Sequence, residues 1–199
     1  MTTETTTATT TATTATSGFA LSTQQKNFFD TFGYLKISGL LAADMPSISN
    51  AFNTLFGVND GEVIDWLHEA HYMKSRKVLL QFIERLPELG SLLDHPVIDG
   101  IFRSILGNDY LYRASEGNVF TGDTYWHSDL YGAHFKYQHI KILLYLEPLD
   151  GQSGGFRAIP GSHHFGDKFA NLLEKYVWKH EENYGLSKDD VPGIVVPTN

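Results

Sequence analysis

Apolar side chains recur at helical spacing in three segments of the first half of the chain. The first segment follows Ser22 and Thr23, either of which can cap a helix, and it ends at Gly33, which suits a helix C-terminus. The second and third segments follow Asp44 and Asp94, and each has a proline in its first turn. We therefore predict three helices, whose apolar residues include Phe28, Phe29 and Phe32; Ile48, Phe52, Leu55 and Phe56; and Val97, Ile98, Ile101, Phe102, Ile105 and Leu106.

The second half of the chain changes from helical spacing to alternation. Residues 110–159 are rich in aromatic and β-branched side chains and contain Gly-rich turns, which is typical of antiparallel strands. Residues 140–146 form the clearest predicted strand, in which Lys141, Leu143 and Tyr145 face away from the apolar residues at even positions. We also predict a helix over residues 167–178, helical or irregular structure over residues 60–90, and strands at residues 34–37, 156–159 and 194–196.

The order of these elements favours an α+β fold in which helices flank a barrel or a double-stranded β-helix, the jelly roll. Residues 1–20 form a Thr- and Ala-rich tail that cannot bury apolar surface, so we expect it to be disordered. Residues 21–199 are expected to form one domain.

Composition and charge exclude several classes of function. The formal net charge is −8 and the acidic residues are scattered, which argues against nucleic acid or an anionic membrane as the main partner. No apolar run approaches the roughly 18 residues needed to span a bilayer. Because the chain has no cysteine, any metal must be held by His, Asp or Glu. The N-terminal tail lacks the features of a secretory signal, so we expect a cytoplasmic location.

The sequence Tyr-Trp-His-Ser-Asp at residues 125–129 is the most informative stretch. In an extended segment, residues two apart point to the same side, so His127 and Asp129 can bind one metal ion together. An imidazole and a carboxylate are two of the three ligands in the facial triad of non-haem iron enzymes. Alone, the His-x-Asp pattern arises often by chance, and a surface or hydrogen-bonded histidine is the alternative interpretation.

The surrounding motifs give that pair a context. A Gly-rich segment at residues 116–124 precedes it, and the sequence Gly-Gly-Phe-Arg-Ala-Ile-Pro-Gly-Ser-His follows at residues 154–163. Together with Phe-Phe-Asp-Thr-Phe-Gly-Tyr-Leu at residues 28–35, this combination resembles the phytanoyl-CoA dioxygenase family of Fe(II)/2-oxoglutarate-dependent dioxygenases. The resemblance covers roughly residues 21–199.

The resemblance implies a jelly-roll core in which His127, Asp129 and a distal histidine hold Fe(II). It also implies 2-oxoglutarate and O2 as co-substrates, with an arginine shortly after the distal histidine binding the far carboxylate of 2-oxoglutarate. The implied reaction converts 2-oxoglutarate to succinate and CO2 and hydroxylates a small-molecule substrate. The protein would supply metal geometry, a dry site and positioning.

The chain departs from the family pattern in its last residues. The family's distal histidine and arginine are expected after a segment like residues 184–193, and neither residue type follows that segment here. We therefore expect the sequence to be a truncated record of a longer protein. His134, His139, His163 and His164 are alternative third ligands, whereas the pair His68 and His71 lacks the spacing of a zinc-protease helix.

Four further residues are candidate contacts for the co-substrate. Lys141 could pair with a carboxylate and Tyr145 could donate a hydrogen bond, although an exposed lysine and a core tyrosine explain the same pattern. Asn118 and Thr124 could reach the pocket from the preceding segment, and ordinary turn chemistry is their alternative. Trp126 is interpreted as a packed wall and Arg157 as a surface residue.

Three functions fit the sequence. The first is an Fe(II)/2-oxoglutarate-dependent oxygenase, and the second is a catalytically incomplete fragment or jelly-roll binding module that lacks the third metal ligand. The third is a cupin-like metal enzyme that does not use 2-oxoglutarate. The sequence does not select a substrate or an oligomeric state.

Overall fold

The structure is a computed structural model of the 199-residue chain. It describes residues 18–59, 62–65, 75–120, 126–129, 137–150, 154–173, 175–176, 190–191 and 193–196. Several predictions fall outside the described residues: most of the N-terminal tail, His68, His71, Thr124 and His134.

Helix α1, Thr23–Phe32, begins and ends as the sequence predicts. Ser22 is its N-cap: the hydroxyl accepts a hydrogen bond from the Gln25 N–H, and the Gln25 side chain accepts one from the Ser22 N–H. At the other end, Gly33 has a φ of 79° and its N–H donates to the Phe29 carbonyl at 2.7 Å. Both caps satisfy backbone groups that the helix leaves unpaired.

The main apolar core lies between helix α2, Met45–Asn59, the 3-10 helix η2, Ile83–Arg85, and the short helix α3, Pro87–Gly90. The predicted second helix is confirmed, because α2 starts directly after Asp44 and buries Ile48 and Leu55. Phe52 and Phe56 stack on each other with ring centroids 4.5 Å apart and cover the edge of the core. The buried residues of this core are Ile48, Ala51, Leu55, Leu79, Phe82, Leu89 and Leu92.

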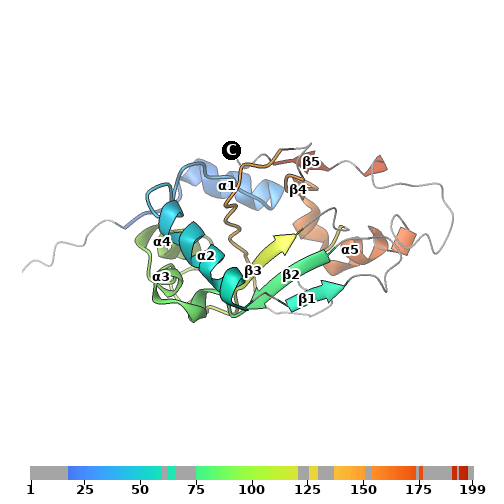
Figure 1. Cartoon of the computed structure of the whole chain (residues 1–199). Coiled ribbons are helices and arrows are strands. Elements are labelled where there is room, and N and C mark those ends of the chain that lie inside the picture. Colours follow the sequence, from blue (N-terminus) through green and yellow to red (C-terminus); the bar gives the residue numbers. More distant parts are fainter. Residues whose placement is uncertain are drawn as a thin grey trace, which may run out of the picture.

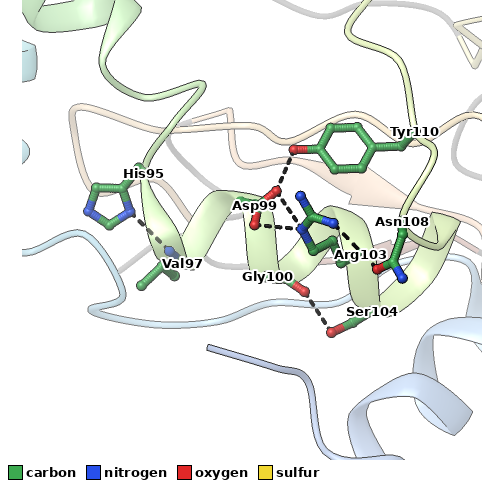
Figure 2. A network of polar contacts seen from close by, with 8 residues as sticks. All are labelled: His95, Val97, Asp99, Gly100, Arg103, Ser104, Asn108 and Tyr110. Atoms are coloured by element: carbon green, nitrogen blue, oxygen red, sulfur yellow. Dashed lines mark hydrogen bonds and ion pairs between the residues drawn. The ribbon is translucent and has the colours of Figure 1, made fainter. Parts of the chain in front are cut away.

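Helix α4, Pro96–Leu106, confirms the third predicted helix and buries Ile98 and Ile101. Its N-cap is His95, whose Nδ1 accepts a hydrogen bond from the Val97 N–H at 3.3 Å. On its outer face, α4 carries a polar network centred on Asp99, which Figure 2 shows from close by.

Three antiparallel strands form the larger sheet in the order β1-β2-β3. They are β1, Glu62–Asp65, β2, Ser75–Leu80, and β3, Glu116–Phe120. Among the described residues of the range 60–90, the prediction of helical or irregular structure is therefore wrong for β1 and β2 and is confirmed for residues 81–90, which contain η2 and α3. Consecutive residues Val78 and Leu79 of β2 are both buried, one on each side of the sheet. A strand that is buried on both sides shows no apolar–polar alternation, so the sequence pattern does not predict β2.

The two sides of this sheet have different surroundings. Leu79 belongs to the helical core and pairs with Gly117, against which the Phe82 ring packs. Val78 pairs with Asn118 and faces the other way. The sheet thus separates the helical core from the side of β3 that carries Glu116 and Asn118, and Figure 1 shows helices α2, α3 and α4 gathered at one end of the sheet.

A smaller two-stranded sheet pairs β4, Arg157–Ala158, with β5, Ile194–Val195. This confirms short strands within the predicted residues 156–159 and 194–196. The 3-10 helix η3, Ser162–Phe165, and helix α5, Asp167–Leu173, follow β4 and confirm the predicted helix through residue 173. The Pro-Gly turn after β4 lies against α1, since the Gly161 N–H donates to the Phe32 carbonyl at 3.0 Å.

Two predicted strands are wrong. Residues 34–37 and residues 140–146 have no strand pairing. Within residues 110–159, the described strands are only β3 and β4. Alternation reports which side chains are buried, whereas a strand also needs a hydrogen-bonded neighbour. The described residues therefore form a mixed helix-and-strand fold with small sheets and do not make up the eight strands of a jelly roll.

Among the described residues, no helix has both the length and the apolar character required to cross a bilayer.

Candidate metal centre

His127 and Asp129 point toward each other, as their spacing predicts. His127 Nε2 lies 3.7 Å from Asp129 Oδ1, and the two side chains are 29% and 49% exposed. Bonds from zinc-like divalent ions to imidazole nitrogen and carboxylate oxygen are about 2.0–2.2 Å long, so two atoms that bind one ion lie at most about 4.4 Å apart. The pair meets this requirement, and its imidazole and carboxylate are suited to a divalent metal ion.

Lys141 joins this pair from the segment that follows it. The Lys141 Nζ lies 3.3 Å from Asp129 Oδ1 and 3.0 Å from Glu116 Oε1 of β3. One ammonium group therefore bridges two carboxylates from different parts of the chain. Lys141, a predicted co-substrate contact, thus donates a hydrogen bond directly to Asp129 of the candidate pair.

The charges in this cluster stabilise one another. The His127 hydrogen bond and the Lys141 charge lower the pKa of Asp129, against the opposing effect of partial burial. Partial burial lowers the pKa of Lys141, but the Glu116 hydrogen bond and the Asp129 charge outweigh it and raise the pKa overall. Asp129 is therefore anionic and Lys141 cationic near neutral pH, which is the state that favours metal binding by the carboxylate.

Tyr145 and Asn118 lie beside this cluster. Burial raises the pKa of Tyr145, and the charge of Lys141 opposes that increase, which places the two side chains within electrostatic reach of each other. Asn118 is two residues from Glu116 along β3, so both side chains lie on the same side of the strand. Lys141 faces the carboxylates, and Leu146 packs on the helical core.

Glu116 is the site residue that sequence reasoning missed. It begins the Gly-rich segment that precedes the metal pair, but nothing in the spacing of that segment connects it with Lys141. The contact depends on β3 pairing with β2 in the observed register, in which Leu80 is opposite Glu116. A lysine 25 residues further along the chain then reaches the carboxylate.

Trp126 and Ser128 anchor the segment that carries the pair. The Trp126 ring packs directly on the Gly193 backbone beside β5, where a larger residue would collide with it. The Arg157 guanidinium of β4 lies 4.9 Å from the centre of the same ring. The Ser128 hydroxyl donates to an Asp167 carboxylate oxygen at the start of α5. The interpretation of Trp126 as a packed wall fits this arrangement.

His163 has a structural contact in place of a metal. Its Nε2–H donates to the Asp30 carbonyl of α1 at 3.0 Å, and its ring packs against Gly33 and the His164 ring. In the part of the chain that the structure describes, no group of three His, Cys, Asp or Glu side chains could hold a metal ion. Among the described residues, His139, His163 and His164 thus do not join His127 and Asp129 in a three-residue group that could hold a metal ion.

Comparison with protein families identifies the chain. The model of the family described as phytanoyl-CoA dioxygenase (PhyH) matches residues 29–189, which include β3, the metal pair, Lys141 and the Pro-Gly-Ser-His turn. Searches of curated proteins and of solved structures found no match. Because the family model spans most of the chain, from α1 to beyond α5, this protein belongs to the phytanoyl-CoA dioxygenase family.

Proposed function

We propose that this protein is an Fe(II)/2-oxoglutarate-dependent oxygenase that hydroxylates a small-molecule substrate. Members of its family are Fe(II)/2-oxoglutarate dioxygenases. The observation that carries the proposal is the approach of His127 Nε2 and Asp129 Oδ1 to 3.7 Å within the family's matched region. In the proposed reaction, 2-oxoglutarate, O2 and a C–H bond give succinate, CO2 and an alcohol.

His127 and Asp129 would hold the ferrous ion. Two protein ligands leave coordination positions for a third ligand, 2-oxoglutarate and O2, and the bound ion would supply the oxidising chemistry. Asp129 suits this role because its contacts with His127 and Lys141 keep it anionic. Trp126 packs on Gly193 and Arg157 and would hold in place the segment that carries the pair.

The remaining predicted residues would position 2-oxoglutarate. The Lys141 ammonium is the cation beside the metal pair, so it would contact a carboxylate of the co-substrate. Tyr145 would donate a hydrogen bond from its hydroxyl on the same side of its segment, and Asn118 would donate one from its side-chain amide on β3. Thr124, which lies outside the described residues, is retained as a candidate from its position in the Gly-rich segment.

Conversion of 2-oxoglutarate to succinate tests this proposal. The full chain is incubated with Fe(II), ascorbate, 2-oxoglutarate and a panel of small-molecule substrates, and succinate is quantified. We expect succinate formation, and we expect His127→Ala and Asp129→Ala each to reduce it by more than about 100-fold, because even groups that only orient metal ligands are typically worth about 10- to 100-fold. His164→Ala, which removes an exposed imidazole outside the pair, serves as the matched control. Absence of succinate, or equal rates in all variants, would contradict the proposal.

A second candidate is a catalytically incomplete form that binds ligands without turnover. The observation that favours it is that the described residues contain only two metal ligands. Each missing ligand removes a metal bond, so a two-ligand site binds Fe(II) weakly. Titration of the chain with Fe(II) under anaerobic conditions separates the two candidates: tight, stoichiometric binding that depends on Asp129 excludes the incomplete form.

A further inference from the structure

We propose that Lys141 is an exchangeable counter-ion of the metal centre, and that Glu116 is a positioning residue that retains the Lys141 ammonium when a metal ion takes its place at Asp129. The inference rests on the proposed metal site and assigns a role to Glu116. It concerns the affinity of the site for a divalent cation and is independent of the substrate.

The geometry makes Lys141 a competitor for a metal ligand. The Asp129 oxygen that faces His127 Nε2 is Oδ1, and the same oxygen receives the hydrogen bond from Lys141. A metal ion held between His127 and Asp129 would therefore use an oxygen that the ammonium already contacts. Two cations on one carboxylate oxygen repel each other, so metal binding favours withdrawal of the ammonium.

Glu116 gives the withdrawn ammonium a partner. Lys141 Nζ is closer to Glu116 Oε1, at 3.0 Å, than to Asp129 Oδ1, at 3.3 Å. An ammonium group has three N–H donors, so it can bond to both carboxylates and can release one without losing the other. Without Glu116, the ammonium would keep its contact with Asp129 and would compete more strongly with the metal.

The two side chains also differ in how firmly their backbones are held. Glu116 is on β3, which pairs with β2 along its whole length. Lys141 is in residues 137–150, which contain no strand or helix. The carboxylate is thus attached to the sheet, and the long lysine side chain, which is 41% exposed, can move between its two partners. Because water reaches all three groups, we expect moderate electrostatic effects.

A double-mutant cycle with Mn²⁺ tests the inference. Isothermal titration of the full chain with Mn²⁺ alone, without 2-oxoglutarate, gives the affinity of the wild type, Lys141→Met, Glu116→Gln and the double variant. We expect Lys141→Met to tighten Mn²⁺ binding by roughly fivefold to tenfold and Glu116→Gln to weaken it by a similar factor. In the Lys141→Met background, Glu116→Gln is expected to change the affinity by less than about twofold, because no ammonium remains to be retained.

Matched variants control for net charge and for folding. Lys168→Met and Glu88→Gln make the same changes of charge at exposed residues of α5 and α3, and we expect neither to change Mn²⁺ affinity. Lys141→Arg preserves the cation and is expected to keep the affinity near that of the wild type. Thermal unfolding of each variant, followed by circular dichroism, verifies that it is folded at the titration temperature.

The outcomes separate this inference from the proposed function. If wild-type Mn²⁺ binding is not lost in Asp129→Ala, the metal site itself is wrong and the proposed function fails with it. If binding depends on Asp129 but Lys141→Met does not tighten it, the counter-ion role is wrong and the metal site stands. An equal loss of affinity from Glu116→Gln with and without Lys141 would mean that Glu116 acts only through its own charge, which would also overturn the inference.

Discussion

At the scale of single residues, Gly117 determines how closely β3 approaches the helical core. The Phe82 ring occupies the space where a Cβ atom of residue 117 would lie. Phe82 is almost completely buried among the side chains of α2, β2 and α3, so it has little room to move. The absence of a side chain at this position therefore permits β3 to carry Glu116 and Asn118 on its opposite side.

Substitution of Gly117 tests this contact. We expect Gly117→Ala to lower the free energy of unfolding by about 1–3 kcal/mol, because overpacking a filled core forces side chains or backbone to shift. Gly57→Ala is the matched control: its Cβ would meet no atom within 4 Å, and alanine favours a helix interior by about 0.5–1 kcal/mol. Urea unfolding of both variants measures the difference. An unchanged stability in Gly117→Ala would show that Phe82 can adjust.

At the scale of elements, α4 shows how a helix combines an apolar face with a polar network. Arg103 Nε donates to both Asp99 oxygens, at 2.9 and 2.7 Å, one turn apart on the helix. The Tyr110 hydroxyl, just beyond the end of the helix, donates to Asp99 Oδ1 at 2.8 Å (Figure 2). Asp99 thus links α4 to the chain that leads toward β3.

This network predicts a pH-dependent contribution to stability. The hydrogen bond from Arg103, followed by that from Tyr110, lowers the pKa of Asp99 below its ordinary value. A carboxylate with a lowered folded-state pKa stabilises the fold above its unfolded-state pKa of about 3.9 and loses that contribution as the pH falls through the folded-state pKa. We expect Asp99→Asn to lower the Tm at pH 7 and to differ progressively less from the wild type below about pH 4. Calorimetry across this range measures it, and a constant difference at all pH values would contradict the assignment.

At the scale of the whole molecule, helix α1 contacts a turn that lies far from it in the sequence. The Gly161 N–H donates to Phe32, and His163 donates to Asp30, so the turn after β4 closes on the C-terminal end of α1. Figure 1 shows the end of α1 beside β4. The metal pair is connected to the same region through the contacts of Trp126 with Gly193 and Arg157.

Substitution of His163 tests whether this residue has a structural role or is a metal ligand. We expect His163→Ala to reduce the free energy of unfolding by about 0.5–1.5 kcal/mol, the usual net value of one hydrogen bond, and to leave Mn²⁺ affinity unchanged. His127→Ala is expected to do the reverse, with little effect on stability in the metal-free protein and loss of Mn²⁺ binding. Loss of Mn²⁺ affinity in His163→Ala would identify it as the third ligand.

Local signals explain which parts of the fold could be predicted. Helices α1, α2 and α4 were recognised from caps, prolines and apolar spacing, all of which act within one or two turns of the chain. The sequence does not predict strand β2, because burial on both sides removes the alternating pattern. Residues 140–146 are predicted as a strand from their alternating pattern, but they have no partner strand. Strand pairing depends on distant segments, and no local pattern determines it.

The sequence by itself determined that an imidazole and a carboxylate lie on one side of the chain, because His127 and Asp129 are only two residues apart and the pleat of an extended segment is local. Only the tertiary structure decided that Lys141 and Glu116 join them, because that contact requires β3 to pair with β2 and a later segment to pass beside it. Contacts of this kind depend on how distant segments fold together, so they cannot be predicted from the residue types and spacing within one segment.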